Sequence, residues 1–353
     1  MAGADGRLGV AIIGLGGIHT GHVRGFQQAQ DVCAITAVCD VDGALAERRA
    51  AELGATAYSD YREMLASDEV DLVDVLLPHS LHFQVVRDSL EHDKHTLVEK
   101  PMAASSAQAR ELVEIAERRG LHFTVAENTR FVTAYLRVGE IIESGAIGEP
   151  HMVRTLICGS EVERLSRTDL WKGRRDGTVG GAILDAGPHS FYLIEWLVGP
   201  IAELWASTAK LVEVSEVEDY GIVGGRLANG ASFTTEFTFT ATIPWSERLE
   251  LYGSEGSVIV DQLCDPPAVI FRGKDADAEP LAEVPFAPFE WKRDSIADGV
   301  EDFVRSVHGD RAPGVDPWSG PRTLELVETA YAAIAPAKPT PATTRSAAGS
   351  DPQ

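Results

Sequence analysis

The stretch Leu8-Gly-Val-Ala-Ile-Ile-Gly-Leu-Gly-Gly-Ile-His19 decides the fold of this chain. Its apolar residues up to Ile13 have the pattern of a buried parallel strand, and a helical stretch follows the glycines as far as Gln30. A Gly-x-Gly turn between a strand and a helix is the context of a dinucleotide-binding site. Gly14 allows the tight turn, and Gly16 lets the main chain approach a pyrophosphate at the helix N-terminus.

One position departs from the full Gly-x-Gly-x-x-Gly fingerprint. His19 occupies the place of the third glycine, which governs close packing of the helix on the strand. On the glycines alone, a simple strand–helix turn stays an alternative to a nucleotide site. We expect Gly17, Ile18 and His19 to line the cofactor turn, with His22 bordering it.

A carboxylate follows the next predicted strand, 34–39. Asp40 lies roughly 20 residues after the turn, where an acidic side chain binds the adenosine ribose. Because a carboxylate at this place repels a 2′-phosphate, the sequence predicts NAD rather than NADP. Asp42 is the alternative ribose ligand, although it suits better the N-cap of a predicted helix at 43–53.

The alternation of strands and helices continues to about residue 127. Alternation at this spacing predicts a doubly wound parallel sheet, and hence a nucleotide-binding domain over 1–127. Further strands are expected at 57–59, 70–77, 96–98 and 122–126, and helices at 60–66, 83–92 and 105–120.

Polar motifs follow several of these strands. Ligands of a doubly wound sheet bind at the carboxyl ends of its strands, so we expect these motifs to converge on one edge. A lysine held there beside a glutamate, with its backbone fixed by proline, suits acid/base chemistry, although Glu-Lys-Pro also occurs in surface loops. The motifs are Pro78-His79-Ser-Leu-His82, Glu99-Lys100-Pro101 and Glu127-Asn128-Thr-Arg130.

The pattern changes at residue 128. Strands dominate the following part, so we expect an α+β domain over 128–335 with a large, mostly antiparallel open sheet. Asn229-Gly230 is a strong hairpin signal, and Gly253-Ser-Glu-Gly256 predicts another tight turn. The segment 336–353, rich in Pro, Ala, Thr and Ser, is expected to be a disordered tail. Expected strands are 151–158, 201–211, 220–227, 232–240, 248–252, 257–261 and 269–271, and expected helices are 134–144, 296–307 and 321–335.

A second motif, Gly180-Gly-Ala-Ile-Leu-Asp-Ala-Gly-Pro-His189, lies inside this domain. If 182–198 is helical, Asp185 and His189 share a face, and Pro188 either kinks the helix or marks a second start. Imidazole accepts a proton near neutral pH, and an adjacent carboxylate orients it and stabilises its charged form. The alternative is a capping aspartate and a packed core histidine.

Composition excludes several classes of function. The net charge of −23 argues against nucleic acid and against anionic membrane surfaces, because both require a basic patch. The cysteines, which have no CxxC or metal spacing, indicate reduced thiols in a cytoplasmic protein. No signal peptide and no membrane span are expected. The pairs His79/His82 and His92/His95 lack a third ligand, so no metal site is predicted.

In this order and spacing, the motifs resemble those of the Gfo/Idh/MocA oxidoreductases, relatives of glucose–fructose oxidoreductase and inositol 2-dehydrogenase. The resemblance runs from about residue 10 to residue 335. It rests on Gly14-x-Gly-Gly, Asp40, Pro78-x-x-x-His82, Glu99-Lys-Pro101, Asn128-x-Arg-Phe131, Gly180-Gly-x-x-x-Asp-x-Gly-x-His189 and Gly253-Ser-Glu-Gly256. His19, and His79 where the family usually has Asn, are departures that affect cofactor contacts.

The resemblance implies a Rossmann nucleotide-binding domain and a catalytic set of Lys100, Asp185 and His189. It implies an NAD-dependent dehydrogenase of a cyclic polyol, sugar or glycoside, with Lys100 and His189 sharing the hydroxyl proton and Asp185 orienting the substrate or His189. Alternatives are redox-assisted glycoside cleavage with bound NAD, and a non-enzymatic NAD-sensing regulator. A homodimer or homotetramer through the C-terminal sheet is expected. Asn128, Trp171 and Lys172 are expected in the pocket wall, and Pro78, His79, His82, Glu99, Lys100 and Asn128 beside the cofactor.

Overall fold

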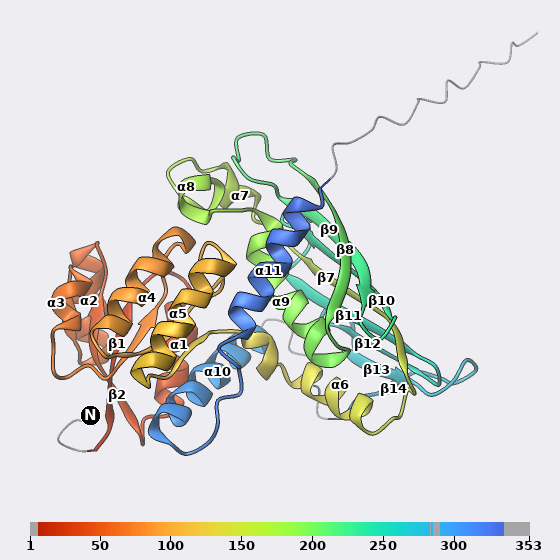
Figure 1. The fold of residues 1–353 in the computed structure, drawn as a ribbon, viewed down its shortest axis with the longest axis horizontal. Coiled ribbons are helices and arrows are strands. Elements are labelled where there is room, and N and C mark those ends of the chain that lie inside the picture. The colour runs from red at the N-terminus through yellow and green to blue at the C-terminus, as the bar shows by residue number, and fades with distance from the viewer. Residues whose placement is uncertain (1–5, 283, 285–289, 335–353) are drawn as a thin grey trace, which may run out of the picture.

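The computed structural model describes residues 6–282, 284 and 290–334, and it contains two sheets with helices between and around them (Figure 1). The predicted tail at 336–353 lies outside the described residues. Among those residues, no helix combines the length and apolarity that a membrane span requires.

The first sheet has six parallel strands in the order β3-β2-β1-β4-β5-β6. This is the strand order of a dinucleotide-binding sheet and confirms the predicted fold class. The strands are β1 (Leu8–Ile13), β2 (Cys33–Cys39), β3 (Thr56–Tyr58), β4 (Leu72–Val75), β5 (His95–Val98) and β6 (Phe123–Val125). Its helices are α1 (His19–Gln28), α2 (Gly43–Leu53), α3 (Tyr61–Leu65), the short 3-10 helix η1 (His79–Leu81), α4 (His82–Glu91) and α5 (Ser106–Arg119).

Side-chain caps fix where two of these helices begin. The Asp42 carboxylate accepts a hydrogen bond from the Leu45 N–H at 3.1 Å, so Asp42 is the N-cap of α2, as the sequence predicts. Ser105 caps α5 in the same way, and Gly120 ends that helix in the left-handed conformation at φ 66°.

The second sheet has eight strands in the order β14-β13-β12-β11-β7-β10-β9-β8. Only β7 and β10 pair in parallel, which confirms the mostly antiparallel prediction. Both predicted turns are present: Gly230 has φ 88° between β9 and β10, and the Gly253 N–H donates to the Gly256 carbonyl at 2.8 Å. The strands are β7 (Pro150–Cys158), β8 (Ile201–Ala209), β9 (Tyr220–Leu227), β10 (Ser232–Thr238), β11 (Ser246–Gly253), β12 (Ser257–Asp261), β13 (Ala268–Phe271) and β14 (Glu279–Pro280).

Helices α9 (Ala182–Leu197) and α11 (Ser319–Ala332) lie between the two sheets (Figure 1). α9 packs on β9 and β10, and α11 contacts α9, β8 and α5. α9 runs through Pro188 as one helix, so this proline does not mark a second helix start. The helices between β6 and α9 in the chain are η2 (Asn128–Phe131), α6 (Thr133–Glu143), α7 (Val162–Ser166), η3 (Trp171–Gly173) and α8 (Arg175–Thr178).

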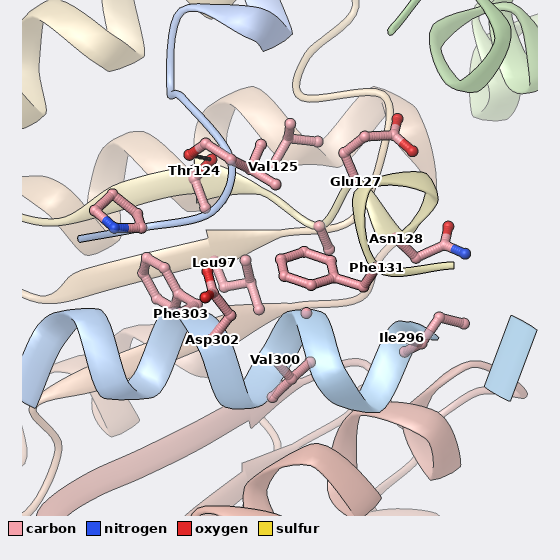
Figure 2. A pocket seen from close by; sticks show the side chains of 14 residues that line it. Leu97, Thr124, Val125, Glu127, Asn128, Phe131, Ile296, Val300, Asp302 and Phe303 are labelled. Atoms are coloured by element: carbon pink, nitrogen blue, oxygen red, sulfur yellow. Dashed lines mark hydrogen bonds between the residues drawn. The ribbon is translucent and has the colours of Figure 1, made fainter. Parts of the chain in front are cut away.

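Helix α10 (Glu290–His308) comes from the second half of the chain but packs on the first sheet against α1. Its Val300, Phe303 and Val304 share a buried core with β1 and β2. The approach is close because α1 presents glycines: a Cβ on Gly25 would lie 2.5 Å from the Ala297 oxygen. Figure 2 shows the seam on the other side of this helix, where Phe131 of η2 lies over it. The described helix already includes Glu290, six residues before the predicted 296–307, and Glu290 supplies an acidic side chain in its first turn.

Candidate active site

The glycine turn after β1 fits a dinucleotide. Gly14 has φ 93°, and a Cβ there would lie 2.3 Å from the Leu76 oxygen, so only glycine is accommodated. At Gly16 and Gly17 a Cβ would meet nothing within 4 Å, so the space beside this turn is open. No described side chain caps the N-terminus of α1, although the His19 and Gly21 N–H groups donate to the Gly16 and Ile18 carbonyl oxygens at 3.4 and 3.0 Å. A helix N-terminus without a side-chain cap favours an anion such as a pyrophosphate.

Two predicted cofactor residues contact this turn. The Leu15 N–H donates to Asp40 Oδ2 at 2.9 Å, so the carboxylate at the end of β2 is held against the glycines. His19 Nδ1 lies close to the Gly16 carbonyl oxygen, and His19 is buried as the first residue of α1. The placement of Asp40 fits the predicted ribose contact.

The histidines after β4 are buried rather than exposed to a cofactor. The rings of His79 and His82 pack edge to face, and His79 Nδ1 lies 3.1 Å from the Thr178 carbonyl oxygen. His82 is fully buried, with its ring nitrogens 2.7 and 2.8 Å from the carbonyl oxygens of Pro101 and Leu77. The expectation that His82 contacts the cofactor is therefore corrected: its ring joins two strand ends and fixes the turn that carries Lys100.

Lys100 and Asp185 come together from the two halves of the chain. Lys100 Nζ donates to Asp185 Oδ1 at 2.7 Å and to the Asp185 carbonyl oxygen at 2.8 Å. Lys172 Nζ donates to the other carboxylate oxygen at 2.5 Å, and His79 Nε2 lies 3.7 Å from Oδ1. A single carboxylate therefore joins two ammonium groups.

This arrangement sets the protonation states. Burial opposes ionisation of Asp185, but the ammonium groups of Lys100 and Lys172 outweigh it and hold the pKa of that carboxyl well below its usual range. Burial also opposes the charge on Lys100, yet Asp185 and Glu99 raise the pKa of Lys100 above its ordinary value. Lys100 is therefore a charged hydrogen-bond donor at neutral pH.

His189 is oriented by Glu127, not by Asp185. Glu127 Oε1 lies 2.7 Å from His189 Nδ1 and also accepts a hydrogen bond from the Thr129 N–H at 3.1 Å. Although burial favours the neutral acid, His189 lowers the pKa of Glu127, so the carboxylate is charged. The expectation that Asp185 orients His189 is corrected, because Asp185 is occupied by the two lysines. Figure 2 shows the Glu127 carboxylate pointing away from α10.

A buried network lies behind Lys100. His22 Nδ1 is 2.9 Å from Asp74 Oδ2, and His22 Nε2 is 3.2 Å from Glu99 Oε1. Burial opposes the charge on His22, but Asp74 and Glu99 raise the pKa of His22 to about 10. The Lys100 N–H donates to the other Glu99 oxygen at 3.0 Å. His22 therefore lies beneath the turn that presents Lys100, not at the glycine turn.

Lys100, Asp185 and His189 line one cavity of about 310 Å³. Lys100 comes from the first half of the chain, whereas Asp185 and His189 come from α9, so the two halves build one site. Lysines, carboxylates and a tryptophan make up most of its wall. The lining residues are Lys100, Glu161, Arg164, Lys172, Asp185, Ala186, His189, Trp245, Glu247, Gln262 and Lys292.

Two predicted pocket residues lie elsewhere. Asn128 Nδ2 donates to the Ser295 hydroxyl at 2.9 Å in the seam beside α10 (Figure 2). Trp171 packs edge to face on His79 at 4.9 Å between ring centres and is not among the residues that line the cavity. Lys172 does line the cavity, as expected. Sequence reasoning missed the role of Glu127, although its place at a strand end was noted, and it missed Trp245, Glu247, Gln262 and Lys292.

No group of three or more His, Cys, Asp and Glu side chains within the described residues could hold a metal ion.

The fold and the site define a class: a nucleotide-dependent oxidoreductase with a Rossmann domain and a second, sheet-based domain that completes the cavity. The chain belongs to the Gfo/Idh/MocA family. Residues 8–127 match its "Oxidoreductase family, NAD-binding Rossmann fold" domain, and residues 135–259 match the "GFO/IDH/MocA C-terminal domain". The predicted family, and with it NAD as the cofactor, is thereby confirmed.

Several named proteins are similar over most of the chain. Myo-inositol 2-dehydrogenase of Thermotoga maritima is 25% identical over 323 residues, which cover 90% of this chain and 93% of that protein. The dTDP-3,4-didehydro-2,6-dideoxy-alpha-D-glucose 3-reductase of Saccharopolyspora spinosa is 32% identical, covering 80% and 81%. The structure of GenD2 from gentamicin A biosynthesis in complex with NAD is 26% identical, has a TM-score of 0.81 and covers 93% of this chain and 94% of that chain.

Proposed function

We propose that this protein is an NAD-dependent dehydrogenase that oxidises a secondary hydroxyl of a cyclic polyol, sugar or glycoside. The observation that carries the proposal is the convergence of Lys100, Asp185 and His189 on one cavity, with His189 backed by the buried Glu127. The names of the relatives, which include an inositol dehydrogenase and a sugar-nucleotide reductase, support this substrate class.

NAD, when bound, accepts a hydride from the carbinol carbon. The Glu127 carboxylate fixes the proton of His189 on Nδ1, so Nε2 is left as the acceptor of the hydroxyl proton. Glu127 then stabilises the imidazolium that forms. Lys100, kept charged by Asp185, donates a hydrogen bond to the substrate oxygen as it becomes a carbonyl. The balance is a secondary alcohol and oxidised cofactor giving a ketone, reduced cofactor and one proton.

The charges around Lys100 support separate roles for Lys100 and His189 in this proposal. Because Asp185 and Glu99 favour the ammonium form of Lys100, the lysine acts as donor and His189 as acceptor, instead of the two sharing one role. The proposed preference for NAD over NADP rests on Asp40 beside the glycine turn, and assembly through the second sheet remains a prediction.

The test is formation of NADH with a panel of inositols, aldoses and glucosides. Lys100→Met should abolish turnover while NADH binding, measured by calorimetry, stays near that of the wild type. Lys274→Met, which removes a lysine with a 90% exposed side chain, is the matched control and should change neither quantity. Full turnover by Lys100→Met would remove Lys100 from the mechanism.

A further inference from the structure

A buried chain of three polar side chains connects the helix at the glycine turn with the turn that carries Lys100. His22 is the fourth residue of α1, Asp74 belongs to β4, and Glu99 directly follows β5. The side chains of His22 and Asp74 are 0% exposed, and that of Glu99 is 14% exposed. The His22 ring contacts one carboxylate with each nitrogen, Asp74 with Nδ1 and Glu99 with Nε2.

His22 and Glu99 are charged although they are buried. Burial opposes ionisation of Glu99, but His22 and Lys100 outweigh it and lower the pKa of Glu99 to about 2. Because the pKa of His22 is raised, its ring is an imidazolium and donates from both nitrogens. Glu99 accepts two hydrogen bonds, from the Nε2–H of His22 at 3.2 Å and from the Lys100 N–H at 3.0 Å. His22 therefore acts on the main chain of Lys100 through Glu99.

Packing of the sheet does not require this chain of polar groups. Leu72, Val73 and Val75 of β4 are fully buried, so an apolar side chain in place of Asp74 would continue their core. Replacing buried charges with well-packed apolar groups is often neutral or stabilising. Asp74 Oδ1 has no hydrogen-bond partner within the described residues, which adds to the cost of burying this carboxylate. A carboxylate that orients an imidazole, which in turn orients another group, is typical of functional sites.

The main chain that carries Lys100 is held by two side chains. Glu99 accepts the Lys100 N–H, and His82 Nδ1 lies 2.7 Å from the carbonyl oxygen of Pro101. The first of these contacts leads back through His22 to α1, the helix that begins at the open glycine turn. The ammonium of Lys100 extends from this fixed main chain to Asp185 in the cavity.

We propose that His22 is a positioning residue: it holds Glu99, and Glu99 fixes the main chain of Lys100 where its ammonium reaches Asp185 and the substrate oxygen. Asp74 in turn orients the His22 ring. The role of Lys100 in this proposal rests on the proposed function, whereas the link from His22 to Lys100 can be tested without a substrate.

Two neutral replacements of His22 separate its two contacts. The amide nitrogen of a glutamine can take the place of Nε2, and that of an asparagine the place of Nδ1. His22→Gln therefore keeps a donor for Glu99, and His22→Asn keeps a donor for Asp74. Each variant loses the charge and one hydrogen bond, so each is the matched control for the other.

Amide hydrogen exchange of the full chain, followed by NMR, measures the link directly. The Lys100 amide should exchange about tenfold or more faster in His22→Asn than in His22→Gln, because its acceptor Glu99 is no longer held. The Glu99 amide, which donates to the Val75 carbonyl oxygen at 3.0 Å, is the internal reference and should exchange alike in both variants. A merely structural ion network predicts equal exchange of the Lys100 amide in the two variants, or parallel changes at Glu99 and Lys100, and either result would overturn the proposal.

The wild-type protein provides a second measurement should His22→Asn fail to fold. Both N–H groups of the His22 ring, assigned by their absence from the spectrum of His22→Gln, should give signals protected from exchange with water at pH 7. A missing Nε2–H signal would show that the ring does not donate to Glu99, which would also overturn the proposal.

Kinetics then connect the link with the reaction. His22→Asn should have a kcat about tenfold or more below that of His22→Gln, while the KM for NAD differs less than about threefold, because a misplaced Lys100 affects the transition state more than cofactor binding. Equal kcat values in the two variants would refute the positioning role of His22. Absence of NADH formation by the wild type with every member of the panel would overturn only the proposed function, since the exchange comparison needs no substrate.

Discussion

Replacing Gly25 of α1 with alanine should destabilise the protein by about 2 kcal/mol, because overpacking a tight contact costs about 1–3 kcal/mol. The added Cβ would lie 2.5 Å from the Ala297 oxygen and 2.5 Å from Val300 Cβ, and both atoms belong to α10. One is backbone and the other is the branch point of a side chain, so neither moves aside freely. The helix propensity of alanine, up to about 1 kcal/mol better than glycine, offsets only part of this cost.

The assay is thermal unfolding of Gly25→Ala beside Gly139→Ala, a matched control in α6. A Cβ on Gly139 would meet its nearest atoms, in Leu197 and Trp196, at 3.8 Å, which is ordinary contact. The control should therefore gain up to about 1 kcal/mol from helix propensity. If Gly25→Ala unfolds at the wild-type temperature or above, the close approach of α1 and α10 described above is refuted.

Glu127→Gln should lower kcat about 100-fold or more with little effect on the KM for NAD, because a neutral amide neither fixes the His189 tautomer nor stabilises its charged form. Steady-state kinetics tests this against the control Glu236→Gln, a glutamate of β10 that does not line the cavity, and an unchanged kcat would show that Glu127 takes no part in the reaction. The pKa of His22 is about 10 in the folded protein against an ordinary value of 6.5, so the stability that this group contributes is complete below pH 6.5 and is lost as pH rises through 10. Urea unfolding of His22→Gln should accordingly show a flatter dependence on pH across that window, and parallel curves for the two proteins would count against a charged His22. Val179 has φ 67° and ψ −32°, a conformation that is strained for a β-branched residue, so Val179→Gly should raise the free energy of unfolding by about 1 kcal/mol. A lower unfolding temperature of this variant would contradict the prediction.

The sequence was sufficient for most of the strands and longer helices, and the three residues of the predicted catalytic set line one cavity. The apolar run before Gly14, the alternation up to residue 127 and the Asn229-Gly230 hairpin each express a local rule, and the structure follows them. The partners of the catalytic residues were not local. The spacing of Asp185 and His189 shows that they share a helix face, but not that Lys172 and Glu127 lie opposite.

Three further residues of the cavity lining could not be predicted from the sequence for a related reason. Glu247, Gln262 and Lys292 belong to no motif, and they meet because β11, the end of β12 and the first turn of α10 converge. Likewise, the sequence analysis assigned the last two helices to the second domain, whereas α10 packs on the first sheet. Hydrophobic periodicity shows that a helix has an apolar face, but it does not show which sheet that face packs on. Only the glycines of α1 hint at the destination of α10.

The return of α10 to the first sheet has a consequence for dissecting the protein. A fragment ending near residue 127 would keep every strand of the first sheet, yet α1 would lose the helix that covers Gly21 and Gly25. The apolar face of α1 that this helix covers would be exposed in the fragment and would promote aggregation. A single proteolytic nick near residue 132, by contrast, would leave both pieces tethered by packing, so cleavage there would not release a nucleotide-binding module.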